Sequence, residues 1–284
     1  MATPASPPAE IPGAAAVAAC AAMAVSYVTV LYAPTALLRM PPPTSLRSFL
    51  HRRFACAAVA SVASALATAA LLRVWSLREV SDMLAVFGIR KDHLLEAVMI
   101  PLLLTSLVYS GSFVAKLCLL SSSCGGDGDQ VGICFWQRIL HRIEAAVGDV
   151  MVWRNFVVAP VTEELVFRAC MIPLLLCGGF KMYNIIFLSP VFFSLGVQLG
   201  YTVIFGWYAA FLFLRTGNLL SPIIAHIFCN MMGLPVFSSL RTRGLASVAF
   251  LVGSISFFWL LFSATSPELY NSSGKYFPLS YAEL

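Results

Sequence analysis

The chain alternates long apolar stretches with short polar ones, which is the pattern of a helical membrane protein. A helix that crosses the hydrocarbon core of about 30 Å needs roughly 20 mostly apolar residues. Six stretches meet or approach this length, at 13–31, 54–72, 94–120, 156–177, 219–234 and 245–264. They predict an all-α, polytopic transmembrane bundle, because helices satisfy their own backbone hydrogen bonds in lipid.

One stretch, 183–214, does not fit a single span. It holds 32 residues without a charge, and one helix of this length would be about 48 Å long. Two antiparallel spans would have about 16 residues each, which is short, and only Gly196 and Gly200 are available to form a turn. We expect seven to eight spans in total, and the awkward length indicates that residues are missing from this region.

Residues 135–151 show a different pattern. Apolar side chains recur at helical spacing, while Arg138, His141 and Arg142 mark a polar side. We expect a helix lying in the membrane interface. The pattern predicts a disordered N-terminus at 1–12, N-terminal transmembrane helices at 13–120 and a polar loop at 121–134. A second helical region at 135–264, which carries the candidate site residues described below, and a polar C-terminal tail at 265–284 follow.

Arginines predict the orientation of the bundle. Cytosolic loops of membrane proteins are enriched in Lys and Arg, and the loop after the first span carries four arginines, Arg39, Arg47, Arg52 and Arg53. We therefore place this loop and the polar loop of 121–154 in the cytosol. If 183–214 holds two spans, Arg241 and Arg243 also face the cytosol, so the rule favours two.

Composition agrees with a lipid environment. Only 11% of the residues are charged, against about 25% in soluble domains. The net charge of +5 is scattered, and no dense basic run suggests nucleic acid. The eight cysteines follow no metal or disulfide spacing.

An ionisable cluster lies inside the stretch 156–177. A charge near the bilayer centre costs roughly 2.5–3.5 kcal/mol, yet this stretch contains Glu163, Glu164 and Arg168. Glu164 and Arg168 are four residues apart and can pair on one helix face. Glu163 is then turned about 100° away and is free to act as a general base in a cavity. Alternatively, Pro160 starts a helix and the carboxylates only complement its dipole.

A second pair of candidate residues is His226 and Asn230. Their i, i+4 spacing places the imidazole and the amide on one helix face, where both can donate to one oxyanion. The alternative is that His226 is an ordinary core residue. With two spans in between, Asn230 and Glu163 both lie roughly 8–10 Å deep on the cytosolic side.

Together the motifs resemble a known family. Glu-Glu-x-x-x-Arg in one span and His-x-x-x-Asn in a later one are similar to the type II CAAX prenyl endopeptidases of the CPBP/ABI membrane protease superfamily. The flanking sequence matches the family as well, at 159–164, 198–206, 211–218 and 221–235. The resemblance covers about residues 20–265.

The resemblance implies a fold and an activity. Members of the family lie in the endoplasmic reticulum membrane, with eight helices around a conical cavity. They remove the C-terminal aaX tripeptide from prenylated CaaX proteins such as small GTPases. By similarity, Glu163 activates water, Glu164 and Arg168 orient the site, and His226 and Asn230 hold the oxyanion. A glutamate protease needs no metal or other cofactor, although a metalloprotease mechanism is the alternative for this family.

The sequence departs from the family between these motifs. The family has a Phe-x-x-x-His motif there, whose His helps the first Glu to bind water. Here 189–193 begins this region, but no His follows before His226. The stretch 183–214, which is too short for two full spans, lies at the same place. We therefore predict a deletion of a few tens of residues near 194–197. A non-catalytic binder of prenylated chains is therefore an alternative function. A transporter is disfavoured, since no internal repeat is evident.

Overall fold

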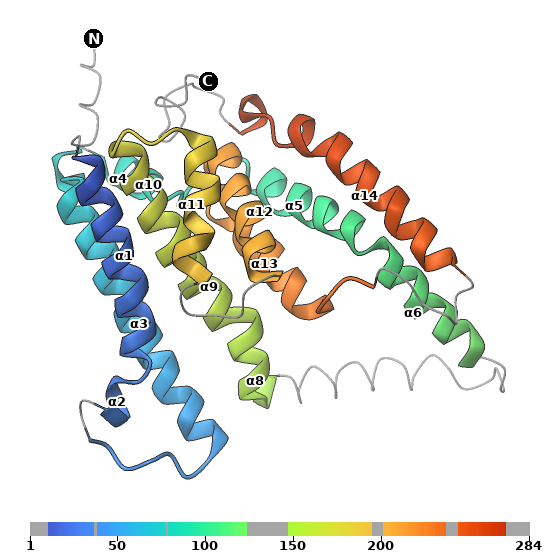
Figure 1. Cartoon of the computed structure of the whole chain (residues 1–284), viewed down its shortest axis with the longest axis horizontal. Helices are drawn as coiled ribbons and strands as arrows, with labels where there is room; N and C mark the ends of the chain where they lie inside the picture. The colour runs from blue at the N-terminus through green and yellow to red at the C-terminus, as the bar shows by residue number, and fades with distance from the viewer. Residues whose placement is uncertain are drawn as a thin grey trace.

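The computed structural model describes residues 11–36, 39–77, 79–123, 147–194, 201–236 and 244–270. All regular structure in these ranges is helical (Figure 1). The predicted interfacial helix at 135–151 and the disordered segment at 1–12 lie largely outside the described residues. The same holds for the polar loop at 121–134 and for most of the tail at 265–284.

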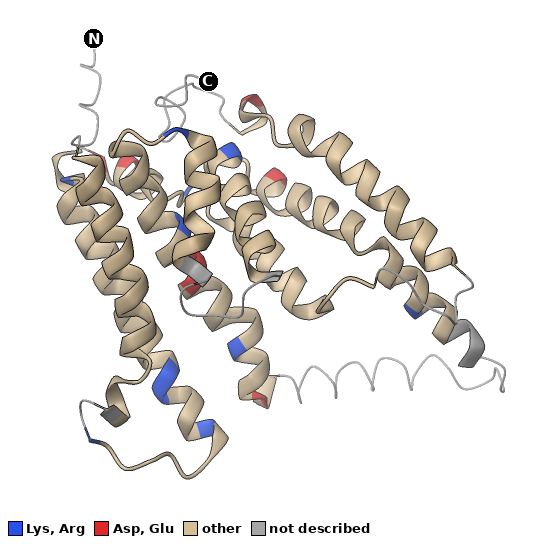
Figure 2. Cartoon of the chain, in the orientation of Figure 1, with Lys and Arg blue, Asp and Glu red and all other residues tan. Residues whose placement is uncertain are grey.

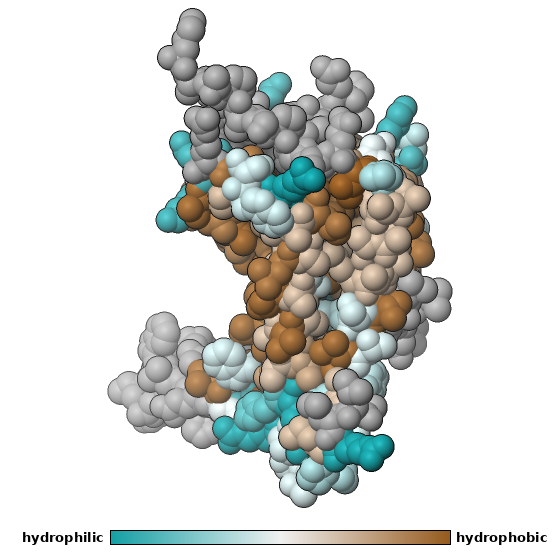
Figure 3. Space-filling view, turned by 90° about the vertical axis from the view of Figure 1, so that its left-hand side faces the viewer, coloured by the Kyte–Doolittle hydropathy of each residue, from teal (hydrophilic) through white to brown (hydrophobic). Residues whose placement is uncertain are grey.

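Three helices are long and apolar enough to cross a membrane by themselves. They are α1 (Gly13–Val30), α3 (Leu46–Leu71) and α14 (Leu245–Ala264). Each coincides with a predicted span. Many charged residues lie toward the two ends of the bundle, and the ionisable cluster lies between them (Figure 2). Apolar side chains cover the middle height of the face drawn in Figure 3. The prediction of an all-α, multi-pass membrane bundle is therefore confirmed.

Short helices join these spans. They are α2 (Ala33–Ala36), the 3-10 turn η1 (Val74–Ser76), α4 (Val80–Val86) and the 3-10 turn η5 (Pro267–Leu269). Between the long helices lie shorter apolar ones, which build the part of the bundle that carries the ionisable cluster.

The predicted continuous span at 94–120 is wrong at Tyr109. Helices α5 (Leu94–Val108) and α6 (Ser110–Ser123) meet there at an angle of 68°. Helix α14 crosses the break, because Gly253 lets its backbone approach: a Cβ at Gly253 would clash with the carbonyl oxygen of Leu107. Ser110 adds a hydrogen bond of 2.6 Å from Oγ to the carbonyl of Ala249.

The predicted span at 156–177 is one helical segment that contains two π turns. It comprises α8 (Val150–Trp153), η2 (Arg154–Val158), α9 (Ala159–Glu164), η3 (Leu165–Cys170) and α10 (Met171–Cys177). Each π turn ends shortly before a proline, Pro160 or Pro173. Proline leaves the carbonyl four residues earlier without a donor, and widening of the preceding turn relieves this strain.

The stretch 183–214 contains two helices, α11 (Met182–Ser194) and α12 (Tyr201–Thr216). They run in opposite directions (Figure 1) and pack closely, since a Cβ at Gly206 would lie 2.9 Å from Cβ of Pro190. This arrangement agrees with the two-span interpretation. With 13 and 16 residues, however, both helices are shorter than the roughly 20 residues of a full span.

The core surrounds the helix that carries the cluster. All seven residues of α10 are buried, and α1, α3 and α11 pack around it. Helix α13 (Leu220–Met232) packs against α5, α12 and α9. The ionisable cluster is thus held between two rigidly packed helices, α9 and α13.

Gly253 is expected to be essential for the crossing of α14 over the α5–α6 break. Gly253→Ala should lower the stability by about 1–3 kcal/mol, because the added methyl group meets backbone rather than a flexible side chain. Thermal unfolding in detergent measures the effect. Gly148→Ala is the matched control, since a Cβ there meets nothing within 4 Å. An equal effect of the two substitutions would contradict the crossing.

Candidate active site

The centre of the site is a buried ion pair. Glu164 and Arg168 both have 0% exposed side chains, and Nε of Arg168 lies 3.1 Å from Oε2 of Glu164. The guanidinium also donates through Nη1 to Oε1 of Glu164 at 3.3 Å and through Nη2 to the carbonyl of Gly206 on α12 at 3.4 Å. One hydrogen bond and one close charge contact from Arg168 therefore hold the carboxylate.

His226 on α13 contacts the same carboxylate. Its Nδ1 lies 2.8 Å from Oε1 of Glu164. An ionised carboxylate only accepts hydrogen bonds, so Nδ1 carries the hydrogen and the ring is oriented by Glu164. The ring of Phe205 packs against the imidazole, with centroids 4.9 Å apart. Nε2 of His226 is therefore left to face Glu163.

Glu163 is the more accessible carboxylate. Its side chain is 22% exposed, and its Oε2 lies 3.9 Å from Nε2 of His226. Among the residues that the structure describes, no arginine pairs with it as Arg168 pairs with Glu164. The two neighbouring carboxylates therefore have different environments: Glu164 is fixed in the core, and Glu163 lies at an accessible edge.

Asn230 lies one helical turn after His226 and is exposed. Its Nδ2 donates to the backbone carbonyl of Asn155 at 2.8 Å. This carbonyl lacks its helical donor for a clear reason. The N–H of Ala159 bonds to the carbonyl of Arg154 instead, in the π pattern, and Pro160 has no N–H to offer. Asn230 thus satisfies a backbone group that the π turn leaves free.

The structure brings Glu163, Glu164, Arg168 and His226 into one connected network. Asn230 lies beside it, engaged with η2. Among the described ranges, no group of three or more His, Cys, Asp or Glu side chains is arranged to hold a metal ion.

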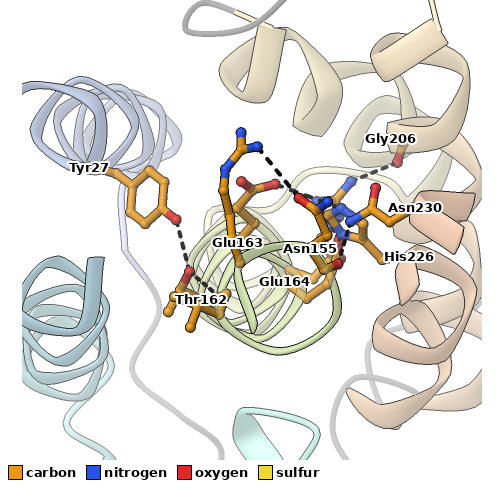
Figure 4. A network of polar contacts seen from close by, with 11 residues as sticks. Tyr27, Asn155, Thr162, Glu163, Glu164, Gly206, His226 and Asn230 are labelled. Carbon is orange, nitrogen blue, oxygen red and sulfur yellow. Dashed lines mark hydrogen bonds and ion pairs between the residues drawn. The ribbon is translucent and has the colours of Figure 1, made fainter. Parts of the chain in front are cut away.

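Three supporting residues were not predicted as part of the site, namely Asn155, Phe205 and Tyr27. Tyr27 of α1 contacts Thr162 with an O–O distance of 2.9 Å, and Thr162 donates to the carbonyl of Val158 at 2.7 Å. Tyr27 is therefore the donor to Thr162, on the opposite side of α9 from His226 (Figure 4). A hydroxyl group in the apolar stretch 13–31 was the available signal for Tyr27.

Comparison with known proteins identifies the family. The model for type II CAAX prenyl endopeptidases, Rce1-like, matches residues 148–232. CAAX prenyl protease 2 of Arabidopsis thaliana is 51% identical over 290 aligned residues, which cover 91% of this chain and 92% of that protein. The chain belongs to the type II CAAX prenyl endopeptidase family. CAAX prenyl protease 2 of Homo sapiens is 34% identical, over 89% of this chain and 82% of that protein.

The alignments with both relatives contain positions that have no counterpart in this chain. Because 91% of its 284 residues is about 258, about 32 of the 290 positions aligned with the Arabidopsis thaliana protein have no counterpart in it. The alignment with the human protein gives about 31 such positions of 284 by the same reasoning.

No solved structure matches this chain.

The buried pair predicts a large and specific stability effect. Arg168→Met should cost about 3–5 kcal/mol, because it leaves the charge of Glu164 buried without compensation. The double variant Arg168→Met with Glu164→Gln should recover part of this loss, since no buried charge remains. Thermal unfolding in detergent measures both.

Arg154→Met is the control for loss of an arginine, because Arg154 is exposed on the same helical segment. If Glu164→Gln destabilises Arg168→Met as much as it destabilises the wild-type chain, the two side chains do not act as a pair.

Proposed function

We propose that this chain is an endopeptidase that releases the C-terminal aaX tripeptide from prenylated CaaX proteins of the small GTPase type, at the endoplasmic reticulum membrane. Membership of the family and the printed names of its relatives support this proposal. The observation that carries it is the placement of Glu163. This accessible carboxylate lies beside Nε2 of an imidazole whose other nitrogen is fixed by a buried carboxylate.

In the proposed reaction, Glu163 acts as the general base. It accepts a proton from a water molecule, whose oxygen attacks the carbonyl carbon of the prenylated cysteine. The peptide bond to the first aliphatic residue then breaks, and the amine of the departing tripeptide takes the proton from Glu163. The atoms balance as one hydrolysis, and the carboxylate returns to its starting state without a cofactor.

His226 and Asn230 are the proposed donors to the oxyanion. In the imidazolium form, Nε2–H of His226 points to the same edge as Glu163. The Asn230 amide has two N–H groups, and one of them is occupied by the carbonyl of Asn155. The other remains for the substrate oxygen. Donors held in this way before the reaction stabilise developing charge most strongly when water is excluded.

Glu164 and Arg168 act as positioning residues in this mechanism. They fix the ring plane of His226, because Glu164 accepts from Nδ1 while Arg168 contacts both of its carboxylate oxygens. A displacement of about 1 Å at a reacting group can cost 10²-fold in rate. The pair therefore contributes to catalysis through geometry, with no direct contact to the reacting atoms.

The second candidate function is that of a membrane protein which binds prenylated chains without cleaving them. It is favoured by the missing Phe-x-x-x-His motif and by the gap of about 32 aligned positions, which we place near 194–197. A water molecule held by Glu163 without that second imidazole would be positioned less well, and the rate would fall.

Hydrolysis of a farnesylated CaaX peptide tests the role of Glu163. Glu163→Gln should reduce tripeptide release by about 10²–10⁴-fold, because the amide accepts no proton while keeping the shape of the side chain. Release is measured in membranes that express the full chain. Glu268→Gln is the control, since Glu268 is an exposed carboxylate in η5 and should leave release unchanged.

The Arabidopsis thaliana relative serves as the reference enzyme in the same assay. If the wild-type chain binds the peptide in a crosslinking experiment but releases no tripeptide, it is the binder and not the protease. If Glu163→Gln releases tripeptide as fast as the wild type, Glu163 is not the base.

A further inference from the structure

A cavity of about 290 Å³ lies outside the proposed catalytic network. It is bounded by the first turns of α3 on one side and by α8 and η2 on the other, at the lower end of the bundle in Figure 1. Arg47, His51 and Phe54 line it from α3, and Trp153 and Val158 line it from the opposite wall. The cavity thus combines cationic and apolar walls at the end of the bundle that is predicted to face the cytosol.

The charge of Arg47 is available to a ligand. Three arginines lie near this end of α3, but two are engaged: Arg52 donates to the carbonyl of Pro41 at 2.6 Å, and Arg53 lies over the ring of Tyr32 at 5.5 Å. Arg47 forms no hydrogen bond or ion pair with any residue that the structure describes. The carboxylate of Asp149, adjacent to the opposite wall, instead caps α8 through the N–H of Met151.

Arg47 and His51 can contact one ligand together. They are four residues apart on α3, so their side chains lie on the same helix face. Guanidinium and imidazole groups one turn apart offer several N–H donors, which suits the oxygens of a phosphate group. The two residues therefore form the polar end of the cavity.

An apolar stripe continues from this polar end along α3. Val59, Val62 and Leu66 follow His51 at spacings of eight, eleven and fifteen residues, which keeps them on its face of the helix. Each is more than half exposed. Trp153 is also 46% exposed, and tryptophan favours the boundary between headgroups and acyl chains. The surface thus offers cations at the boundary and an apolar track into the membrane.

We propose that this cavity binds the phosphate headgroup of an anionic phospholipid of the cytosolic leaflet, with an acyl chain lying along the α3 stripe. Basic pockets between transmembrane helices on the cytosolic side suit such headgroups. The polypeptide of a prenylated substrate is a poorer occupant, because the segment before a prenylated cysteine is usually polybasic and would meet the charge of Arg47. The site is separate from the proposed catalysis.

A bound lipid would link two parts of the bundle. Arg47 and His51 belong to α3, while Trp153 and Val158 precede Glu163 on the helical segment that carries the ion pair. A headgroup between these walls would stabilise the start of that segment against α3.

Binding of phosphatidic acid tests the site. The full chain is placed in nanodiscs of phosphatidylcholine with or without phosphatidic acid, and retained phosphatidic acid is measured by native mass spectrometry. Arg47→Gln should weaken retention about fivefold, as expected for one basic residue near an anionic headgroup. Arg73→Gln removes the same charge from the opposite end of α3 and should leave retention unchanged. Thermal unfolding checks that both variants are folded.

Three results would overturn the proposal. The first is equal retention in Arg47→Gln and in the wild type. The second is an equal fall of retention in both variants, which would indicate general charge attraction. The third result concerns free phosphate: glycerol 3-phosphate, the same headgroup without acyl chains, is added to the detergent-solubilised chain. If it protects the wild type against heat as well as phosphatidic acid does, the occupant is a soluble phosphate. None of these measurements depends on peptide cleavage.

Discussion

The arrangement of the site depends on the buried ion pair of Glu164 and Arg168. Two charges removed from water cost several kcal/mol each, and only good geometry with further hydrogen bonds offsets this. Arg168 supplies two contacts to the carboxylate and one to Gly206, and His226 supplies a third contact to Glu164. The pair therefore ties η3, α12 and α13 together, and the packing of these helices follows from the need to keep it paired.

The same ion pair gives two adjacent carboxylates different environments and different proposed roles. Glu164 is fully buried and contacts Arg168 and His226, whereas Glu163 retains an accessible edge. Glu163 therefore remains available for chemistry beside Nε2 of His226.

Much of this was predictable from the sequence, and the exceptions have physical reasons. Spacing of four residues placed Glu164 by Arg168, and apolar length located α1, α3 and α14. Hydropathy could not show the break at Tyr109, where α14 approaches closely at Gly253, because that contact joins distant parts of the chain. The partner of Asn230 was hidden for a related reason: Pro160 marks a disturbed turn, but the packing of α13 against η2 decides which side chain reaches the free carbonyl of Asn155.

That carbonyl joins three positions that lie far apart in the chain. Pro160 lacks the N–H that could bond to the carbonyl of Asn155, and the Asn230 amide donates to this carbonyl from another helix. A change at position 160 that restored the N–H would give the carbonyl a partner within its own helix, and the amide would lose its anchor. Asn155 contributes only its backbone carbonyl, so the contact makes the orientation of Asn230 on one helix depend on Pro160 on another.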